Sequence, residues 1–226
     1  MQLYGEYNYF DEVTSRHLAE MFKVCTGYDA DAFALFNIDD FGGLCTEHDA
    51  TVSKQVFYSD PLLGLFDKNL SKLDLKTHYK KLLDKFDGIS PQKGLEYLFE
   101  YQKQLIKILY EKCTAGTETM RAYKSRDIKA LAEIAARLAE IAADVEKLRG
   151  MQYEIWNRNN KAFGFEYFDG KLGTVIARLK SSARKIEDYV NGKFDKIEEL
   201  EEEKLYFSGN ENAFVHQYST RVIQMP

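Results

Sequence analysis

The feature that most constrains the fold is a run of apolar residues in the second half of the chain, spaced alternately three and four positions apart. The residues that share this spacing are Leu131, Ile134, Leu138, Ile141, Val145 and Leu148. Such spacing places them on one face of a long α-helix, as in the seam of a coiled coil. Small alanines beside the seam allow a neighbouring helix to approach closely; they stand at positions 130, 132, 135, 136, 139, 142 and 143. We predict a rod of about 45 Å, at a rise of roughly 1.5 Å per residue, paired with the preceding helix as an antiparallel hairpin.

Apolar periodicity predicts further helices over residues 11–25, 31–36, 72–86 and 171–190. A longer helix is expected from residue 90 to about residue 122, because Ser90 can cap a helix whose first position is Pro91. Residues 37–59 carry glycines and no sustained period, which predicts a long exposed connection. The predicted fold class is therefore all-α, a bundle of long antiparallel helices.

The last part of the chain differs from the bundle. Residues 198–203 form an acidic run that we expect to be solvated surface. Residues 205–223 lack a helical period, and residues 220–223 (TRVI) could form a short strand, which predicts a short irregular or β-like C-terminal tail. We predict a single helical domain over residues 1–226. Its parts are short helices and a long loop in 1–70, a long-helix bundle in 71–192, and an acidic segment with a docking tail in 193–226.

Composition argues against several classes of partner. The formal net charge is −5 with acidic and basic residues mixed, so we expect no basic face and no nucleic-acid partner. No stretch reaches the roughly 18 consecutive apolar residues of a membrane span, so we expect no membrane partner. Three cysteines, an odd number at wide spacing, favour a reducing compartment over a disulfide framework, and the expected location is cytoplasmic.

No motif supplies a complete catalytic or metal-binding set. The four histidines lie in separate predicted elements without HxxxH or HExxH spacing, so no metal site is recognisable. Asp39 and Asp40 are adjacent carboxylates, but neighbours in an extended chain point to opposite faces, so a polar loop or a helix cap explains them. Cys45 and His48 lack a recognisable orienting partner and oxyanion hole. We therefore predict no catalytic residue, no metal and no cofactor in this chain.

The most suggestive cluster surrounds the only tryptophan. Trp156, Arg158 and Asn160 lie within a run of amide and cationic residues at the end of the predicted long helix. Aromatic faces stack on the apolar faces of sugar rings, while Asn and Arg donate to hydroxyl groups. The cluster is thus a candidate sugar contact. A tryptophan at a helix end is more often simple packing.

Two stretches resemble a known family: residues 60–67, DPLLGLFD, and residues 156–203, WNRNNKAFGFEYFDGKLGTVIARLKSSARKIEDYVNGKFDKIEELEEE. They are similar to the C-terminal helical domain of bacterial glycoside hydrolase family 20 enzymes. These are β-N-acetylhexosaminidases in which a barrel is followed by a large helical module. The distinctive parts are NKAFGFE, the following helix with Leu172, Gly173 and Arg178, and DYVNGK ending at Lys193.

The resemblance implies release of terminal N-acetylglucosamine or N-acetylgalactosamine, with the substrate's acetamido oxygen attacking the anomeric carbon and an Asp–Glu pair assisting. That pair belongs to a barrel of about 250 residues, for which this chain has neither the length nor the alternation of elements. The implied partners are the catalytic barrel of the parent enzyme, a second copy in a homodimer, and an N-acetylhexosamine glycan at Trp156, Arg158 and Asn160. An exposed apolar surface is expected where the barrel docks.

Two other functions stay open on the sequence alone. An independent helical interaction protein would self-associate through the alanine-rich seam, and the Trp156 cluster would then serve only as packing. A free-standing enzyme would need a site assembled from scattered residues that show no recognisable geometry.

Overall fold

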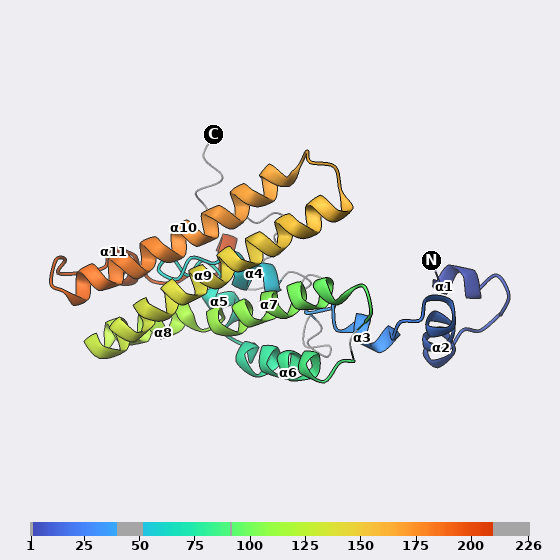
Figure 1. The fold of residues 1–226 in the computed structure, drawn as a ribbon. Helices are drawn as coiled ribbons and strands as arrows, with labels where there is room; N and C mark the ends of the chain where they lie inside the picture. Colours follow the sequence, from blue (N-terminus) through green and yellow to red (C-terminus); the bar gives the residue numbers. More distant parts are fainter. Residues whose placement is uncertain (1, 40–51, 91, 210–226) are drawn as a thin grey trace.

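The computed structural model describes residues 2–39, 52–90 and 92–209, and within these ranges every regular element is a helix (Figure 1). The all-α prediction is confirmed. The short helices of the first part are α1 (Gln2–Glu6), α2 (Ser15–Thr26), α3 (Ala30–Ala34), α4 (Val52–Tyr58) and α5 (Asp67–Leu70). The longer helices are α6 (Leu75–Asp87), α7 (Glu96–Lys112), α8 (Ala115–Lys124), α9 (Ile128–Asn159) and α10 (Phe165–Val190). Helix α11 (Glu198–Glu201) and a 3-10 helix at Phe207–Gly209 follow. Within the described ranges, no helix is both long enough and apolar enough to cross a membrane.

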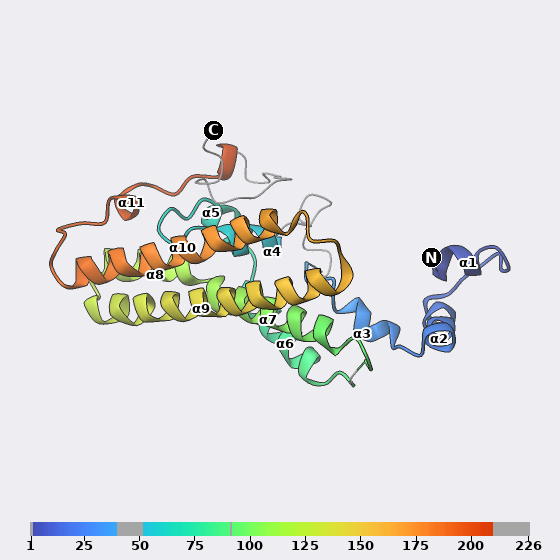
Figure 2. The ribbon, with the colours of Figure 1, turned by 45° about the horizontal axis from the view of Figure 1, so that its top comes forward.

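Helices α9 and α10 run antiparallel and side by side as the backbone of the bundle (Figures 1 and 2). The 32 residues of α9 span about 48 Å. The predicted seam is confirmed, because Leu131, Leu138 and Val145 have no exposed surface. Its principal partner is the following helix, α10, and not the preceding one as we predicted. The reason is that the chain ahead of α9 is broken into α7 and α8, so neither is long enough to match α9.

The alanines beside the seam serve two purposes. Ala135 and Ala142 are buried, where small side chains let neighbouring helices come close. Those at positions 132, 136, 139 and 143 face solvent, where alanine favours the helix by its high intrinsic propensity. Therefore only some of these alanines lie at contacts between helices.

The ends of two helices follow the expected chemistry. Thr14 caps α2 by accepting a hydrogen bond from the His17 backbone N–H, and Gly27 ends the helix at φ 77°. A left-handed residue at this position favours glycine, and the helix ends at Thr26, one residue after the predicted end. Asp127 caps α9 by accepting from the Ala130 N–H at 3.0 Å. The start of the first helix differs from the prediction, since α2 begins at Ser15 after its Thr14 cap and not at residue 11.

The predicted start of the long helix from residue 90 to about residue 122 is wrong. Helix α7 begins at Glu96 instead of residue 90. Gly94 has φ 87°, which interrupts a right-handed helix, and the Gln92 side chain donates to the Ser90 carbonyl and accepts from the Asp29 N–H. These contacts hold the segment as a turn. The helix also ends earlier than predicted, at Lys112, before α8 begins.

Helix α4 lies in the region predicted to be a long exposed connection. Val52, Val56 and Phe57 are at most 5% exposed, so this helix belongs to the core. Seven residues are two turns, which is too short for periodicity to stand out against the background. Residues 40–51 of the predicted loop lie outside the described residues, as does the predicted strand at 220–223.

Residues 197–209, which we call the strap, follow α10 after a short connection and contact both the loop before α5 and α5 itself. Ile197 and Leu200 are buried. The ring of Phe207 lies 4.9 Å from that of Phe66, and its backbone N–H donates to Asn69 Oδ1 at 2.9 Å. The acidic run therefore includes a core residue as well as solvated carboxylates.

Gly64 and Gly116 both lie against the carboxylate of Asp67, and Gly116 gives a test of how tightly this region is packed. A Cβ on Gly116 would lie 2.6 Å from Asp67 Oδ2, whereas a Cβ on Gly150 in α9 would meet nothing within 4 Å. We expect Gly116→Ala to lower the free energy of unfolding by about 1–3 kcal/mol through overpacking. The control Gly150→Ala should raise it by roughly 0.5–1 kcal/mol, since alanine is the better helix former. Urea unfolding measures both, and equal effects would contradict the packing assignment.

Candidate functional site

Catalytic and metal-binding groups do not gather in the described residues. Across residues 2–39, 52–90 and 92–209, no three His, Cys, Asp or Glu side chains are placed to hold a metal ion. His17 hydrogen-bonds Glu6 at 2.9 Å, and His78 hydrogen-bonds the Ile38 carbonyl oxygen at 2.8 Å, so each has a local partner. Asp40, Cys45, His48 and His216 lie outside the described residues.

Asp39 caps a helix, which is one of the two structural roles predicted for it. Its two carboxylate oxygens accept hydrogen bonds from the backbone N–H and the hydroxyl of Ser53, at 2.7 and 2.8 Å. Ser53 lies in the first turn of α4, so Asp39 satisfies a backbone donor that the helix itself cannot. Burial raises the pKa of Asp39, against these two hydrogen bonds, which favour the ionised form.

Trp156 organises the turn between α9 and α10. Its indole N–H donates to the Lys161 carbonyl oxygen at 2.7 Å, and its ring contacts those of Phe165 and Phe168 at centroid distances of 6.2 and 5.4 Å. Gly164 has φ 99°, and a Cβ there would lie 3.2 Å from the indole ring. The string FGFE is thus explained locally, because a glycine lets the chain turn against the tryptophan.

The other two candidate residues share this turn but contact different elements. The Arg158 guanidinium lies 4.2 Å from the centre of the Tyr97 ring on α7, a cation–π contact. Asn160 ends α9 in an extended conformation and is exposed. The structure therefore gathers Trp156, Arg158 and Asn160 at one end of the bundle without directing all three at one point.

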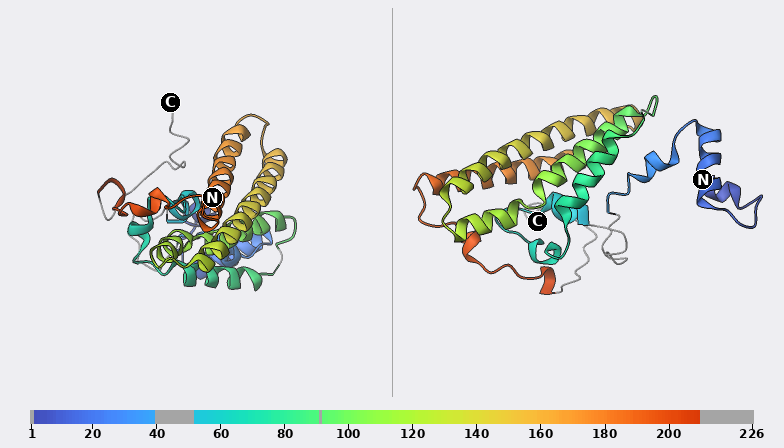
Figure 3. Two further views of the ribbon diagram at one scale, coloured as in Figure 1. Left: turned by 90° about the vertical axis from the view of Figure 1, so that its left-hand side faces the viewer. Right: turned by 90° about the horizontal axis from the view of Figure 1, so that it is seen from below.

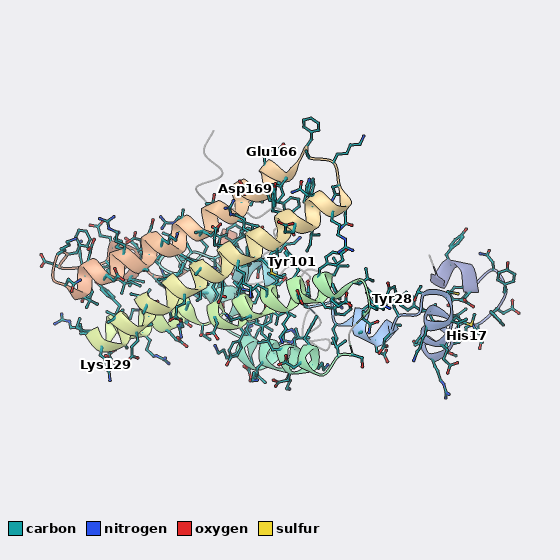
Figure 4. All side chains as sticks on the ribbon, in the orientation of Figure 1. His17, Tyr28, Tyr101, Lys129, Glu166 and Asp169 are labelled. Atoms are coloured by element: carbon teal, nitrogen blue, oxygen red, sulfur yellow. The ribbon has the colours of Figure 1, made fainter. Side chains whose placement is uncertain are left out.

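Exposed aromatic side chains surround the same turn, and sequence reasoning did not single them out. Phe163 at the tip is 89% exposed, and Tyr153, Tyr167 and Phe168 are also exposed. Arg149 on α9 binds Asp169 on α10 at 2.5 Å and joins the two helices; Figure 4 labels Asp169. The turn thus presents aromatic surface from a rigid support.

A second cluster of polar groups is buried where α4, α7 and the strap meet. Lys112 is 5% exposed, and its ammonium donates to the carbonyl oxygens of Val56, Phe57 and Ser59 at 2.7, 2.8 and 2.5 Å. These carbonyls lie at the C-terminal end of α4, where backbone acceptors have no partner within the helix. Burial lowers the pKa of Lys112 to about 7, against the attraction of the nearby carboxylates.

Asp60 and Asp67 of the string DPLLGLFD complete this buried cluster. Asp60 accepts from the backbone N–H groups of Leu62 and Leu63 and binds Arg178 Nε at 2.6 Å. This ion pair joins the two stretches that carry the family resemblance, which are 118 positions apart. Burial raises the pKa of Asp67, while Lys204 and Lys112 act to lower it.

Lys204 of the strap closes the buried cluster. Its ammonium donates to the carbonyl oxygens of Leu62, Leu63 and Glu199, at 2.7, 3.0 and 2.8 Å. The cavity beside Lys112, Asp67 and Gly116 holds about 20 Å³, which is room for roughly one water. This cavity therefore has no room for a substrate, and the polar contacts around it tie α4, α7 and the strap together.

Comparison with known proteins identifies the family. The family model described as the Glycoside Hydrolase 20C C-terminal domain matches residues 31–219. No curated protein matches the chain. The match covers α3 to the strap and both strings on which the resemblance was based, so the chain belongs to the Glycoside Hydrolase 20C C-terminal domain family.

Proposed function

We propose that this chain is the non-catalytic C-terminal helical domain of a β-N-acetylhexosaminidase-like glycoside hydrolase, and that it supports the catalytic barrel. The observation that carries the proposal is the family match over most of the chain. The described helices form a bundle in which Arg178, Lys112 and Lys204 make internal ion-pair and backbone contacts, as expected of a support. The cleavage chemistry would then belong to the barrel.

The same proposal assigns two further roles to the domain: it helps to form a homodimer, and the α9–α10 turn edges a sugar pocket of the same or a neighbouring subunit. The exposed aromatic rings around Trp156 support the sugar contact, because aromatic faces stack on pyranose rings. Arg158 and Asn160 would supply hydrogen bonds to hydroxyl or acetamido groups.

Release of 4-nitrophenol from a 4-nitrophenyl N-acetyl-β-glucosaminide tests the proposal. The assay compares this chain alone with the same chain joined to the coding sequence that precedes it. Hydrolysis by the joined protein only is the expected result. Hydrolysis by the chain alone would overturn the proposal. An absence of hydrolysis by both proteins would favour an independent interaction module.

The self-association alternative has a specific obstacle in the bundle. The seam through which two copies would meet is already covered by helices of the same chain, and Leu131, Leu138 and Val145 have no exposed surface. Pairing through this seam would require α9 to separate from α10. An interaction module would therefore have to use another surface.

Substitutions at the α9–α10 turn test the sugar contact in the joined enzyme. We expect Asn160→Ala to raise KM by roughly two- to tenfold with kcat unchanged, the effect of losing one hydrogen bond worth about 0.5–1.5 kcal/mol in substrate binding. Asn157→Ala is the matched control, because the Asn157 amide donates to the Tyr153 carbonyl of its own helix. Steady-state kinetics measure both. An unchanged KM for Asn160→Ala would remove this residue from the pocket.

A further inference from the structure

The N-terminal part of the chain stands apart from the bundle. Residues 2–29, which we call the arm, comprise α1, α2 and their connections, and they project beyond the end of the long helices (Figures 1 and 3). His17 on the arm and Lys129 at the start of α9 mark opposite ends of the molecule (Figure 4). Helix α2 has no buried residue, although its sequence includes Leu18, Met21 and Phe22. A helix of this composition in a globular protein ordinarily buries one face.

The arm exposes an unusual amount of aromatic and aliphatic surface. Tyr9 is 85% exposed, Tyr4 is 81% and Val24 is 76%, while Tyr7 and Phe10 are also exposed. Tyrosine is enriched in protein–protein contacts because it combines a large apolar face with a polar end. An apolar surface of this kind, together with the uncovered helix α2, marks an interaction site.

The arm is held in shape before any partner binds. Glu6 of α1 is buried and bonds His17 of α2, and the Phe10 ring packs edge-on against the same imidazole at 4.9 Å. At its base, the Tyr28 hydroxyl donates to the Lys93 carbonyl oxygen, and the Phe22 ring contacts Phe33. A surface fixed in advance loses less conformational entropy on binding.

The position of the family match bears on which partner the arm would meet. The match begins at residue 31, so the arm lies outside the matched region and on its N-terminal side. A domain described as C-terminal follows other parts of its parent enzyme, and the arm is the segment nearest to them in sequence. We propose that the arm is the docking surface for the catalytic domain, with the exposed faces of α1 and α2 packed against that domain. This inference rests on the proposed function and names the surface through which support would be given.

Hydrogen exchange tests the arm as an interface. The amides of α2 (Ser15–Thr26) are compared between this chain alone and the chain joined to the catalytic domain that precedes it. We expect exchange in α2 to be at least about tenfold slower in the joined protein, because a covered helix opens less often. Exchange in α8 (Ala115–Lys124), at the opposite end of the bundle, serves as the internal control and should be unchanged.

A set of substitutions adds a second measurement in the joined protein. The triple variant Tyr4→Ser, Tyr9→Ser, Val24→Ser changes only highly exposed side chains, so it should leave the chain alone folded. It should nevertheless restore fast α2 exchange in the joined protein. Ile128→Ser at the far end of the bundle, also an exposed apolar residue, is the matched control and should leave the protection intact.

The possible outcomes separate this inference from the proposed function. An active joined protein with unprotected α2 would overturn the arm interface and leave the proposed function standing. A joined protein without hexosaminidase activity would count against the proposed function itself. Protection of α2 that appears in the chain alone and grows with its concentration would assign the arm to a second copy, which also overturns the inference.

Discussion

Replacing Lys112 by methionine is expected to lower the free energy of unfolding by about 3–5 kcal/mol, as is typical when one partner of a buried charged set is removed. Methionine keeps an apolar stem of similar length but removes the ammonium group. Three carbonyl oxygens at the end of α4 would lose their donor, and Asp67 would lose a nearby positive charge. Denaturant unfolding at pH 6, below the lowered pKa of Lys112, measures the effect with the wild-type ammonium protonated.

Lys107→Met is the matched control on the same helix. Lys107 binds Asp144 at 2.9 Å, but its side chain is 50% exposed. An exposed ion pair of this kind is worth at most about 1 kcal/mol, so the control should differ little from wild type. A loss of less than about 1 kcal/mol for Lys112→Met would mean that the end of α4 does not depend on this cap.

The second large effect is expected in the seam of α9. Leu138 has no exposed surface, and Leu138→Ala would leave a cavity between α9 and the helices packed on it. Comparable leucine truncations cost about 2–5 kcal/mol, from lost burial together with the cavity that remains. Thermal and urea unfolding both measure this change.

Leu205→Ala is the control for the seam variant, because it removes the same atoms from a side chain that is 64% exposed. Substitutions of exposed residues usually change stability by no more than about 0.5 kcal/mol. If the two variants were equally destabilised, α9 would not be the central helix of the core.

Long elements were predictable because their periodicity is repeated many times. The seam of α9 and the apolar face of α10 each extend over several turns, so a single misleading residue does not change the result. Helix α4 has only two turns and was missed, while Ser90 and Pro91 gave a strong local start signal that was wrong. There the left-handed Gly94 and the contact of Gln92 with Asp29, 63 positions away, outweigh the local preference.

The candidate site was predictable only in part. The sequence indicates that Trp156, Arg158 and Asn160 lie at one helix end, since they are neighbours in the chain. The partner of Arg158 is Tyr97, and the acceptors of Lys112 are 53 to 56 positions away, so neither could be found without knowing how the helices pack. A lysine in an otherwise amphipathic helix gives no signal that it is buried. The string DPLLGLFD was recognised, but its contact with Arg178 emerges only from the fold.

The central claim is that this chain supports a catalytic domain, and the thermal stability of that domain tests it most directly. The catalytic domain of the parent enzyme, made as a separate polypeptide, is heated with increasing amounts of this chain. Binding to the folded state alone stabilises it by about 2.7 kcal/mol when the chain is present at 100 times its Kd. The account predicts a saturable rise in the unfolding midpoint of the catalytic domain. An unchanged midpoint at every concentration of the chain would contradict it.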